Sequence, residues 1–222
     1  TPQNIIDRAL EIGLDIIAIT DHNSAKNVKV AVELAQNTDL TVIPGMEVET
    51  KEEVHLVCLF PTVGQALKWQ DIVDDSLPDV SNDEEVFGPQ IITDLNDQYI
   101  KKEEKLLLRA TDLSIEEVIT KVKEIGGIVI PAHIDKSNYS LIANLGFINP
   151  ELDITGVEIS KNITKDKAEN KFRQLKNYSL LCSSDAHYLD DISKQMILYL
   201  KEPTFLEIKK AIHREDKRKI EI

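Results

Sequence analysis

The 222-residue chain has few cysteines, few aromatic residues and a minority of basic residues. Its two cysteines, Cys58 and Cys182, both lie in apolar runs, which argues against a disulfide-stapled scaffold and predicts buried, reduced thiols of a cytoplasmic protein. There are 26 Lys and Arg against 39 Asp and Glu, a formal net charge of −13. Because this charge repels phosphate backbones and anionic lipids, nucleic acid is a disfavoured partner.

Long hydrophobic runs are also absent. No run approaches the roughly 20 apolar residues that a membrane helix requires, and no signal-peptide pattern is present. Hydrophobic residues nevertheless make up 42% of the chain, which is enough for one sizeable core. We therefore expect a single, soluble, cytoplasmic domain over residues 1–222, with no membrane partner.

Apolar runs with strand character alternate with helical periodicities along most of the chain. Thr1 and Pro2 form a helix start, and Ser114 with Glu117 forms a capping box. Asn23 and Ser24 are expected to cap the second helix. Strands are predicted at 15–20, 41–44, 54–60, 128–131, 155–159 and 180–183, and helices near 2–12, 25–36, 114–124, 165–176 and 205–213. This alternation is typical of an α/β fold whose parallel sheet is open or closed into a barrel.

Residues 61–111 interrupt the alternation with a polar, acidic segment. Helices are predicted at 63–76 and 90–105. The segment is interpreted as a solvated helical insertion on the rim of the fold, or as a lid that shapes a substrate pocket. Trp69, the only tryptophan, either stacks on a base or anchors the insertion, and anchoring is the favoured role.

Histidines and one glutamate stand at the ends of several apolar runs. His22 closes IIAITDH, His55 opens HLVCLF, His133 closes GIVIPAH, His187 closes LLCSSDAH, and Glu47 follows VIPGM. Strands that each end in an imidazole or a carboxylate can deliver these groups to one rim of a sheet. Mixed nitrogen and oxygen ligands suit Zn, Mn or Fe, so the pattern predicts a metal site assembled from distant parts of the chain.

The same runs contain motifs that can be compared with a known family. In order they are ITDHN at 19–23, PGMEVET at 44–50 followed by EVHLV at 53–57, PAHIDK at 131–136 and SSDAH at 183–187. Together they resemble the PHP family of metal-dependent phosphoesterases, named for polymerases and histidinol phosphatase. The resemblance extends from Thr1 to about Leu200.

The resemblance implies a distorted seven-stranded TIM-like (β/α) barrel that holds two or three divalent ions, Mn, Zn or Fe, at the carboxyl ends of its strands. The family also carries an H-x-H pair on its first strand, N-terminal to the helix that opens this chain. That strand is missing here, and we expect it to exist upstream in the native protein.

The resemblance further implies a role for each candidate ligand. Glu47 would bridge two metals, His55 and His133 would complete one of them, and Asp185 would bind the other. His22 and His187 would hold a third position. Glu158, which ends another strand, is left outside the ligand set, and His213 is expected at the surface.

The predicted chemistry is hydrolysis at phosphorus. No nucleophile elbow or Walker loop is present, so a metal-bound hydroxide is the expected attacking group. Glu47, Asp185 and His187 are the predicted catalytic residues, and either His187 or a metal-bound water would protonate the leaving alcohol. Lys136 is either a phosphate contact or a surface lysine, and Arg109 is a second candidate for phosphate binding.

Three functions are compatible with the sequence. The favoured one is a hydrolase of a small phosphorylated substrate, a phosphomonoester such as a nucleotide or nucleoside bisphosphate. The second is a nuclease that cuts DNA or RNA phosphodiesters, which would need a basic track with stacking aromatic residues. The third is a non-catalytic PHP module that lacks a full metal set.

Overall fold

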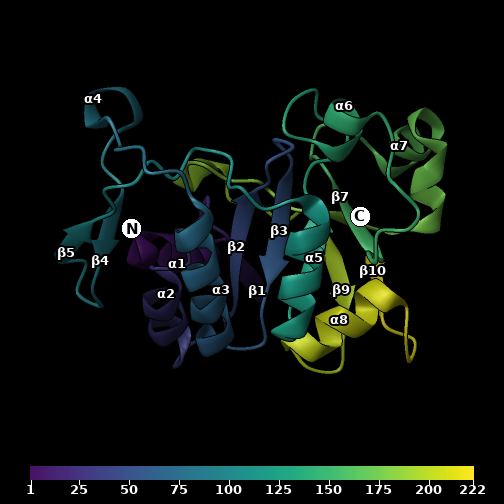
Figure 1. Cartoon of the computed structure of the whole chain (residues 1–222). Helices are drawn as coiled ribbons and strands as arrows, with labels where there is room; N and C mark the ends of the chain where they lie inside the picture. The colour runs from purple at the N-terminus through teal and green to yellow at the C-terminus, as the bar shows by residue number, and fades with distance from the viewer.

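The computed structural model describes the whole chain, residues 1–222, as an α/β fold. Its central sheet has the strand order β1-β2-β3-β6, with β1 at Ile16–Ile19, β2 at Thr41–Glu49, β3 at His55–Leu59 and β6 at Ile128–Pro131. β1 and β2 are parallel, whereas β2–β3 and β3–β6 are antiparallel. The expectation of a purely parallel sheet is therefore wrong, because β2 and β3 are joined by a short turn rather than by a helix (Figure 1).

Three smaller pairs of strands accompany this sheet. β7 at Gly156–Ile159 pairs in parallel with β8 at Ser179–Cys182, and Ile134 N donates to Glu158 O, which places β7 beside the end of β6. β9 at Ile197–Tyr199 pairs with β10 at Lys219–Glu221, and β4 at Ile91–Thr93 pairs with β5 at Tyr99–Lys102. The hydrogen-bonded ladders do not close into a barrel.

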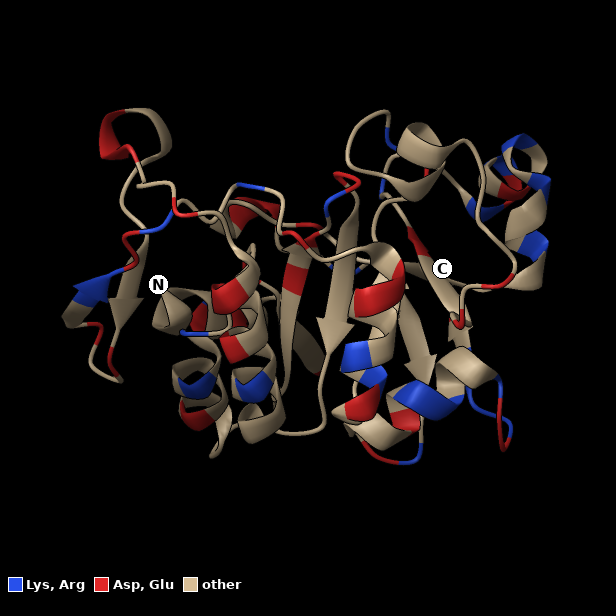
Figure 2. Ribbon diagram, in the orientation of Figure 1, with Lys and Arg blue, Asp and Glu red and all other residues tan.

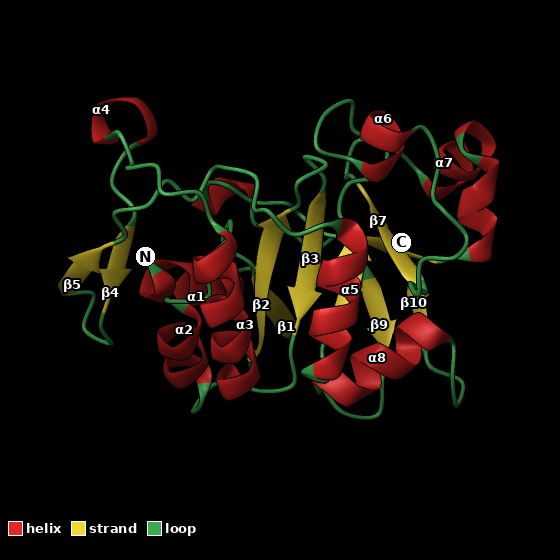
Figure 3. Ribbon diagram, viewed as in Figure 1, coloured by secondary structure: helices red, strands yellow, loops and turns green.

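Helices cover the sheet because its strands are apolar on both faces. α1 (Pro2–Glu11), α2 (Val28–Ala35), α3 (Val63–Ser76) and α5 (Ile115–Glu124) belong to the main core. α8 (Phe205–His213) lies at the lower end of the strands in Figures 1 and 3 and packs against a separate, smaller core. The remaining helices are short: α4 (Glu84–Phe87), α6 (Leu141–Leu145) and α7 (Lys165–Lys171), with 3-10 turns at Arg173–Asn177 and Leu189–Asp191. None of the helices is both long and apolar enough to cross a membrane.

Strand alternation decides which side chains face each core. Val42, Met46 and Val48 of β2 belong to the large core under the helices, whereas Ile43 belongs to the smaller core against α8. Glu47 shares the parity of Ile43, so it lies on the α8 side of the sheet, toward the end of the strand. The α8 side of β2 thus changes from apolar to acidic along its length.

Gly45 lies between Ile43 and Glu47 on this face. A Cβ at residue 45 would come within 2.8 Å of Thr20 Cγ2 and 2.9 Å of Leu59 Cδ2. Only glycine fits such a close approach. The tight contact joins β1, β2 and β3 directly beneath the acidic end of the sheet.

The acidic segment 61–111 divides into two parts. α3 is part of the main core, and Trp69 is fully buried there, as expected for an anchoring residue. The predicted helix over 90–105 is wrong, because this stretch forms the antiparallel hairpin β4–β5. The hairpin and α4 project from the body of the molecule, and we call residues 84–108 the appendage (Figures 1 and 2).

Candidate metal centre

The carboxyl end of β1 and the long strand β2 place the first two candidate ligands. Beyond β1 the chain continues to pair with β2, because Glu47 N donates to Asp21 O at 3.2 Å and Asn23 N donates to Glu47 O at 2.9 Å. This pairing sets His22 directly beside Glu47. His22 Nδ1 lies 3.3 Å from Glu47 Oε2.

β3 brings His55 to the same point. In the antiparallel register His55 lies opposite Glu49, two residues beyond Glu47 on the same face. His55 Nδ1 lies 3.6 Å from Glu47 Oε2, and His55 Nε2 lies 3.9 Å from Glu49 Oε2. Ligand atoms of His22, Glu47 and His55 all lie within 4.8 Å of one another, a spacing that one metal ion can bridge.

His133 and Asp185 follow their strands on unusual backbone. They have positive φ angles of 32° and 47°, which are uncommon for residues other than glycine, although Asn, Asp and His adopt them more often than most. His133 Nε2 lies 3.8 Å from Glu47 Oε1, and its ring centroid lies 5.4 Å from that of His55. Backbone strain of this kind concentrates at functional sites.

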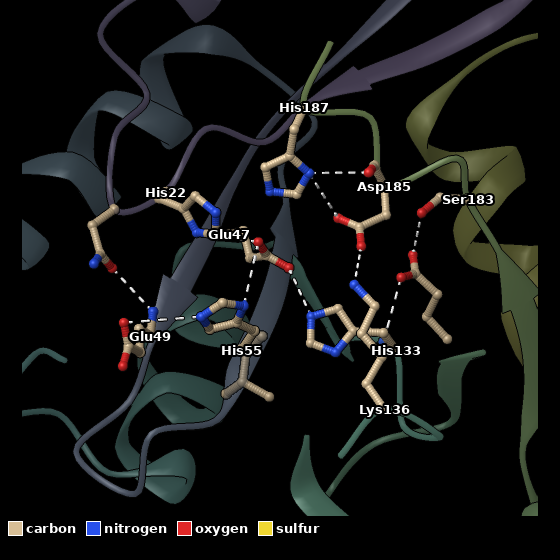
Figure 4. Close-up of polar contacts among 12 residues, drawn as sticks. His22, Glu47, Glu49, His55, His133, Lys136, Ser183, Asp185 and His187 are labelled. Atoms are coloured by element: carbon tan, nitrogen blue, oxygen red, sulfur yellow. Dashed lines mark hydrogen bonds and ion pairs between the residues drawn. The ribbon is translucent and has the colours of Figure 1, made fainter. Parts of the chain in front are cut away.

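The predicted ligands therefore converge from five strands, β1, β2, β3, β6 and β8 (Figure 4). His187 joins the cluster through His22, with ring centroids 5.8 Å apart, and its Nδ1 lies 3.1 Å from Asp185 O. Lys136 Nζ forms a short hydrogen-bonded ion pair with Asp185 Oδ2. The structure thus brings together His22, Glu47, His55, His133, Lys136, Asp185 and His187.

Arg109 is not part of this cluster. Its side chain is exposed, and only its backbone carbonyl reaches the site region, where it accepts a hydrogen bond from Asn23 Nδ2 at 2.9 Å. The proposed phosphate contact of Arg109 stays a prediction.

Two buried carboxylates and one amide of the site were not assigned from the sequence. Glu158 accepts a 2.7 Å hydrogen bond from Ser183 Oγ and a 3.4 Å bond from His133 N, so it holds the turn that carries His133. Glu49 lies beside His55. Asn23 does not cap a helix as expected: its side chain joins Glu49 N to the carbonyls of 107 and 109. Glu158 had a visible signal, since it ends an apolar run like Glu47, whereas the partners of Asn23 depend on strand register.

Burial adjusts the charge states of the cluster. It lowers the pKa of His22 to about 4, helped by the neighbouring His55 and His187 rings. It also lowers the pKa of His133 to about 4, with Lys136 and His55 adding to the effect. Burial raises the pKa of Glu47 to about 7. These histidines are neutral near pH 7 and keep the lone pairs that a metal requires.

The donor set therefore fits divalent transition metals. His133 Nδ1 is buried without a hydrogen-bond partner, which leaves a ligand atom unused by the protein. Asp185 behaves differently from Glu47. Burial acts to raise the pKa of Asp185, but the hydrogen bond from Lys136 lowers this pKa overall and keeps the carboxylate ionised. Neutral imidazoles around carboxylates are the ligands that Zn, Mn and Fe share.

The family model described as the PHP domain matches residues 1–190. An uncharacterised protein of Bacillus subtilis, YqxK, is 34% identical over 106 residues, which cover 45% of this chain and 27% of that protein.

Solved structures share the fold. The lesion-specific endonuclease PfuEndoQ from Pyrococcus furiosus matches 98% of this chain with a TM-score of 0.68 and 21% identity. A putative metal-dependent phosphoesterase from Bifidobacterium adolescentis matches 97% with a TM-score of 0.58 and 15% identity. This chain spans 52% of the endonuclease and 91% of the phosphoesterase.

Proposed function

The chain belongs to the PHP family of metal-dependent phosphoesterases, and on that premise we propose that it hydrolyses a small phosphomonoester such as a nucleotide or nucleoside bisphosphate. The observation that carries the proposal is the convergence of His22, Glu47, His55 and His133, with the cation of Lys136 beside Asp185. This arrangement pairs a set of metal ligands with a positive group that can bind phosphate.

The ligand roles follow from the distances. His22, Glu47 and His55 form the tightest group and would hold one ion. Glu47 also faces His133, so its two oxygens are placed to serve two ions. Asp185 and His187 would supply the remaining ligands. Divalent ions such as Mn, Zn or Fe lower the pKa of a bound water toward about 7 and neutralise charge on a phosphate ester.

The other residues of the site would handle the substrate. If Asp185 binds a metal instead of Lys136, the Lys136 ammonium can donate up to three hydrogen bonds to the phosphoryl oxygens. His187 is exposed, and its Nδ1 lies next to the Asp185 carbonyl, which leaves Nε2 free. This is an alternative to metal binding by His187, because one nitrogen cannot do both: a protonated His187 would donate the Nε2 proton to the leaving alcohol.

The architecture supports a finer proposal for the fold. Strands β1, β2, β3 and β6 are neighbours in that order, and β7 and β8 continue the series beyond β6. We assign this arc of strands to a distorted barrel of the PHP type. The ligands then lie at one rim of that barrel. Residues 1–222 would form one domain, with 61–111 inserted at the rim.

A nuclease is the second candidate. The support is the shared fold with endonuclease Q, including a structure of that enzyme in complex with a 27-mer duplex carrying an abasic lesion, which matches 97% of this chain with a TM-score of 0.69. The net charge of −13 acts against it, because a nuclease must bind a polyanion. This chain spans about half of that enzyme, and the remainder could supply the DNA contacts.

The experiment is an assay of phosphate release from a panel of phosphomonoesters after the purified chain is loaded with Mn, Zn or Fe. An oligonucleotide labelled at one end is assayed beside it. The proposal expects phosphate release that Glu47→Gln abolishes and His213→Ala leaves intact. If the oligonucleotide is cut and no phosphate is released from the monoesters, the phosphatase proposal fails and the nuclease becomes the favoured function.

A further inference from the structure

We propose that a pocket between the appendage and His22 binds a planar aromatic ring of the substrate, such as a nucleobase. This inference rests on the proposed function and narrows it, because it selects nucleotides over sugar or glycerol phosphates. The pocket has a volume of about 270 Å³. That is slightly below the usual range of about 300–1,000 Å³ for whole ligands, so it suits one part of a substrate.

Five of the 11 residues that line the pocket are apolar. They are Phe87, Ile91, Ile92, Leu107 and Leu108 of the appendage. Phe87 and Leu108 are 48% and 47% exposed. Large side chains left open around a hollow mark a binding surface more often than a scattered exposed residue does. An aromatic ring would cover them and stack on Phe87.

The amide groups around the pocket are already engaged. Gln90 donates to the carbonyls of Glu103 and Lys105 and accepts from Leu107 N. Asn27 donates to Ile91 O at 3.0 Å and accepts from Thr93 N at 3.2 Å. The Gln90 bonds brace the appendage internally, and the Asn27 bonds hold it against the body. Neither amide is left free for a ligand.

One carboxylate at the pocket remains free. The Asp21 side chain makes no hydrogen bond or ion pair, whereas Glu103 is paired with Lys26. An ionised carboxylate only accepts hydrogen bonds. The pocket therefore favours a ring that carries N–H donors at its edge, as nucleobases do.

A second pocket on the other side of the cluster has the opposite character. It measures about 190 Å³ and has no hydrophobic residue in its lining. Lys136, Lys161 and Asn162 contribute to it. His22 lines the apolar pocket and His187 lines the polar one, and their ring centroids are 5.8 Å apart. A nucleotide laid across this pair would place its phosphate toward the lysines and its base toward Phe87.

The test compares two substrates that differ only in the base, adenosine 5′-monophosphate and ribose 5-phosphate. Phe87→Ala is measured beside Val86→Ala, a control at an adjacent residue that is 67% exposed and does not line the pocket. Because stacking on an aromatic side chain contributes to base binding, Phe87→Ala should lower the preference for the nucleotide about tenfold, mainly through KM. The rate on ribose 5-phosphate should not change. Leu108→Ala should lower the preference in the same direction.

Binding of adenosine to the metal-free protein, followed by NMR, separates this inference from the proposed function. Adenosine binding that Phe87→Ala weakens supports the pocket even if neither ester is hydrolysed, in which case the phosphatase proposal fails alone. Equal rates on both esters, or an equal loss on both in Phe87→Ala, would overturn the pocket. A labelled oligonucleotide as a third substrate shows whether the base comes from a free nucleotide or from nucleic acid.

Discussion

Tyr139 stacks on His55, with ring centroids 4.7 Å apart and an interplanar angle of 13°. The backbone reinforces this contact, because His55 N donates to Tyr139 O at 2.9 Å. Tyr139 has a φ of 55°, which is strained for a bulky side chain. The stack fixes the plane of the His55 ring while its two nitrogens face Glu47 and Glu49. Tyr139 is thus a positioning residue for a proposed metal ligand.

Replacing Tyr139 by glycine should weaken metal binding without unfolding the protein. Loss of a group that orients a ligand lowers metal affinity by about 10–100-fold, whereas glycine adopts the positive φ without strain. Tyr139→Phe should retain the wild-type affinity. Isothermal titration of the metal-free protein with Zn or Mn measures the effect, with Tyr99→Ala on the appendage as the control. Full affinity in Tyr139→Gly would refute the positioning role.

Lys136→Met should separate substrate binding from metal binding. Lys136 would contact the phosphate, so KM for a phosphomonoester should rise by about tenfold or more, the scale of a lost hydrogen bond to a charged group. Metal binding should be unchanged or tighter, because Asp185 loses its competing partner. Steady-state kinetics and metal titration test both parts, and Lys29→Met on an exposed helix face is the control. A KM equal to that of the wild type would show that Lys136 does not contact the phosphate.

The C-terminal ion pair predicts a pH dependence of stability. Glu207 accepts two hydrogen bonds from Arg218 and one from Lys201 N, and these lower its pKa to about 2 from an ordinary 4.5. A lowered carboxylate pKa adds stability above pH 4.5, and this contribution is lost as the pH falls toward 2. Urea unfolding across this window should therefore show a steeper loss in the wild type than in Glu207→Gln. Glu202→Gln, at an exposed site before α8, should behave as the wild type. Parallel curves for wild type and Glu207→Gln would contradict the prediction.

Local signals predicted much of the fold. The capping box of Ser114 and Glu117 marks the start of α5, and the predicted helix 205–213 has the bounds of α8. The sequence prediction missed the hairpin β4–β5, although aspartates such as Asp94 and Asp97 favour turns. In the structure Asp94 accepts hydrogen bonds from the backbone N–H groups of 96 and 98, and Asp97 has a φ of 58°.

Long-range packing set the limit on the rest. Arg218 lies in the charged run HREDKRK, yet it is buried against Glu207, eleven residues earlier in the chain. The candidate ligands could be predicted because each lies at or near one end of an apolar run. Glu49, Tyr139 and the partners of Asn23 could not, because strand register and the path of a loop bring them to the site.

Asn23→Ala should destabilise the protein although it removes no proposed metal ligand. The change leaves Glu49 N and the carbonyls of Leu107 and Arg109 without their partner. A buried group left unpaired costs about 1–3 kcal/mol. Chemical unfolding measures the loss, and Asn96→Ala in the exposed hairpin turn is the control. Stabilities equal to that of the wild type in both variants would show that this amide does not hold the appendage in place.

We propose that the histidine and carboxylate cluster binds the metals of a phosphoesterase. Elemental analysis of metal per chain, on wild type and Glu47→Gln loaded and dialysed side by side, tests it most directly. The wild type should retain Mn, Zn or Fe and Glu47→Gln should lose it, because Glu47 lies between His22, His55 and His133. Equal metal contents in the two proteins, whether high or near zero, would contradict it.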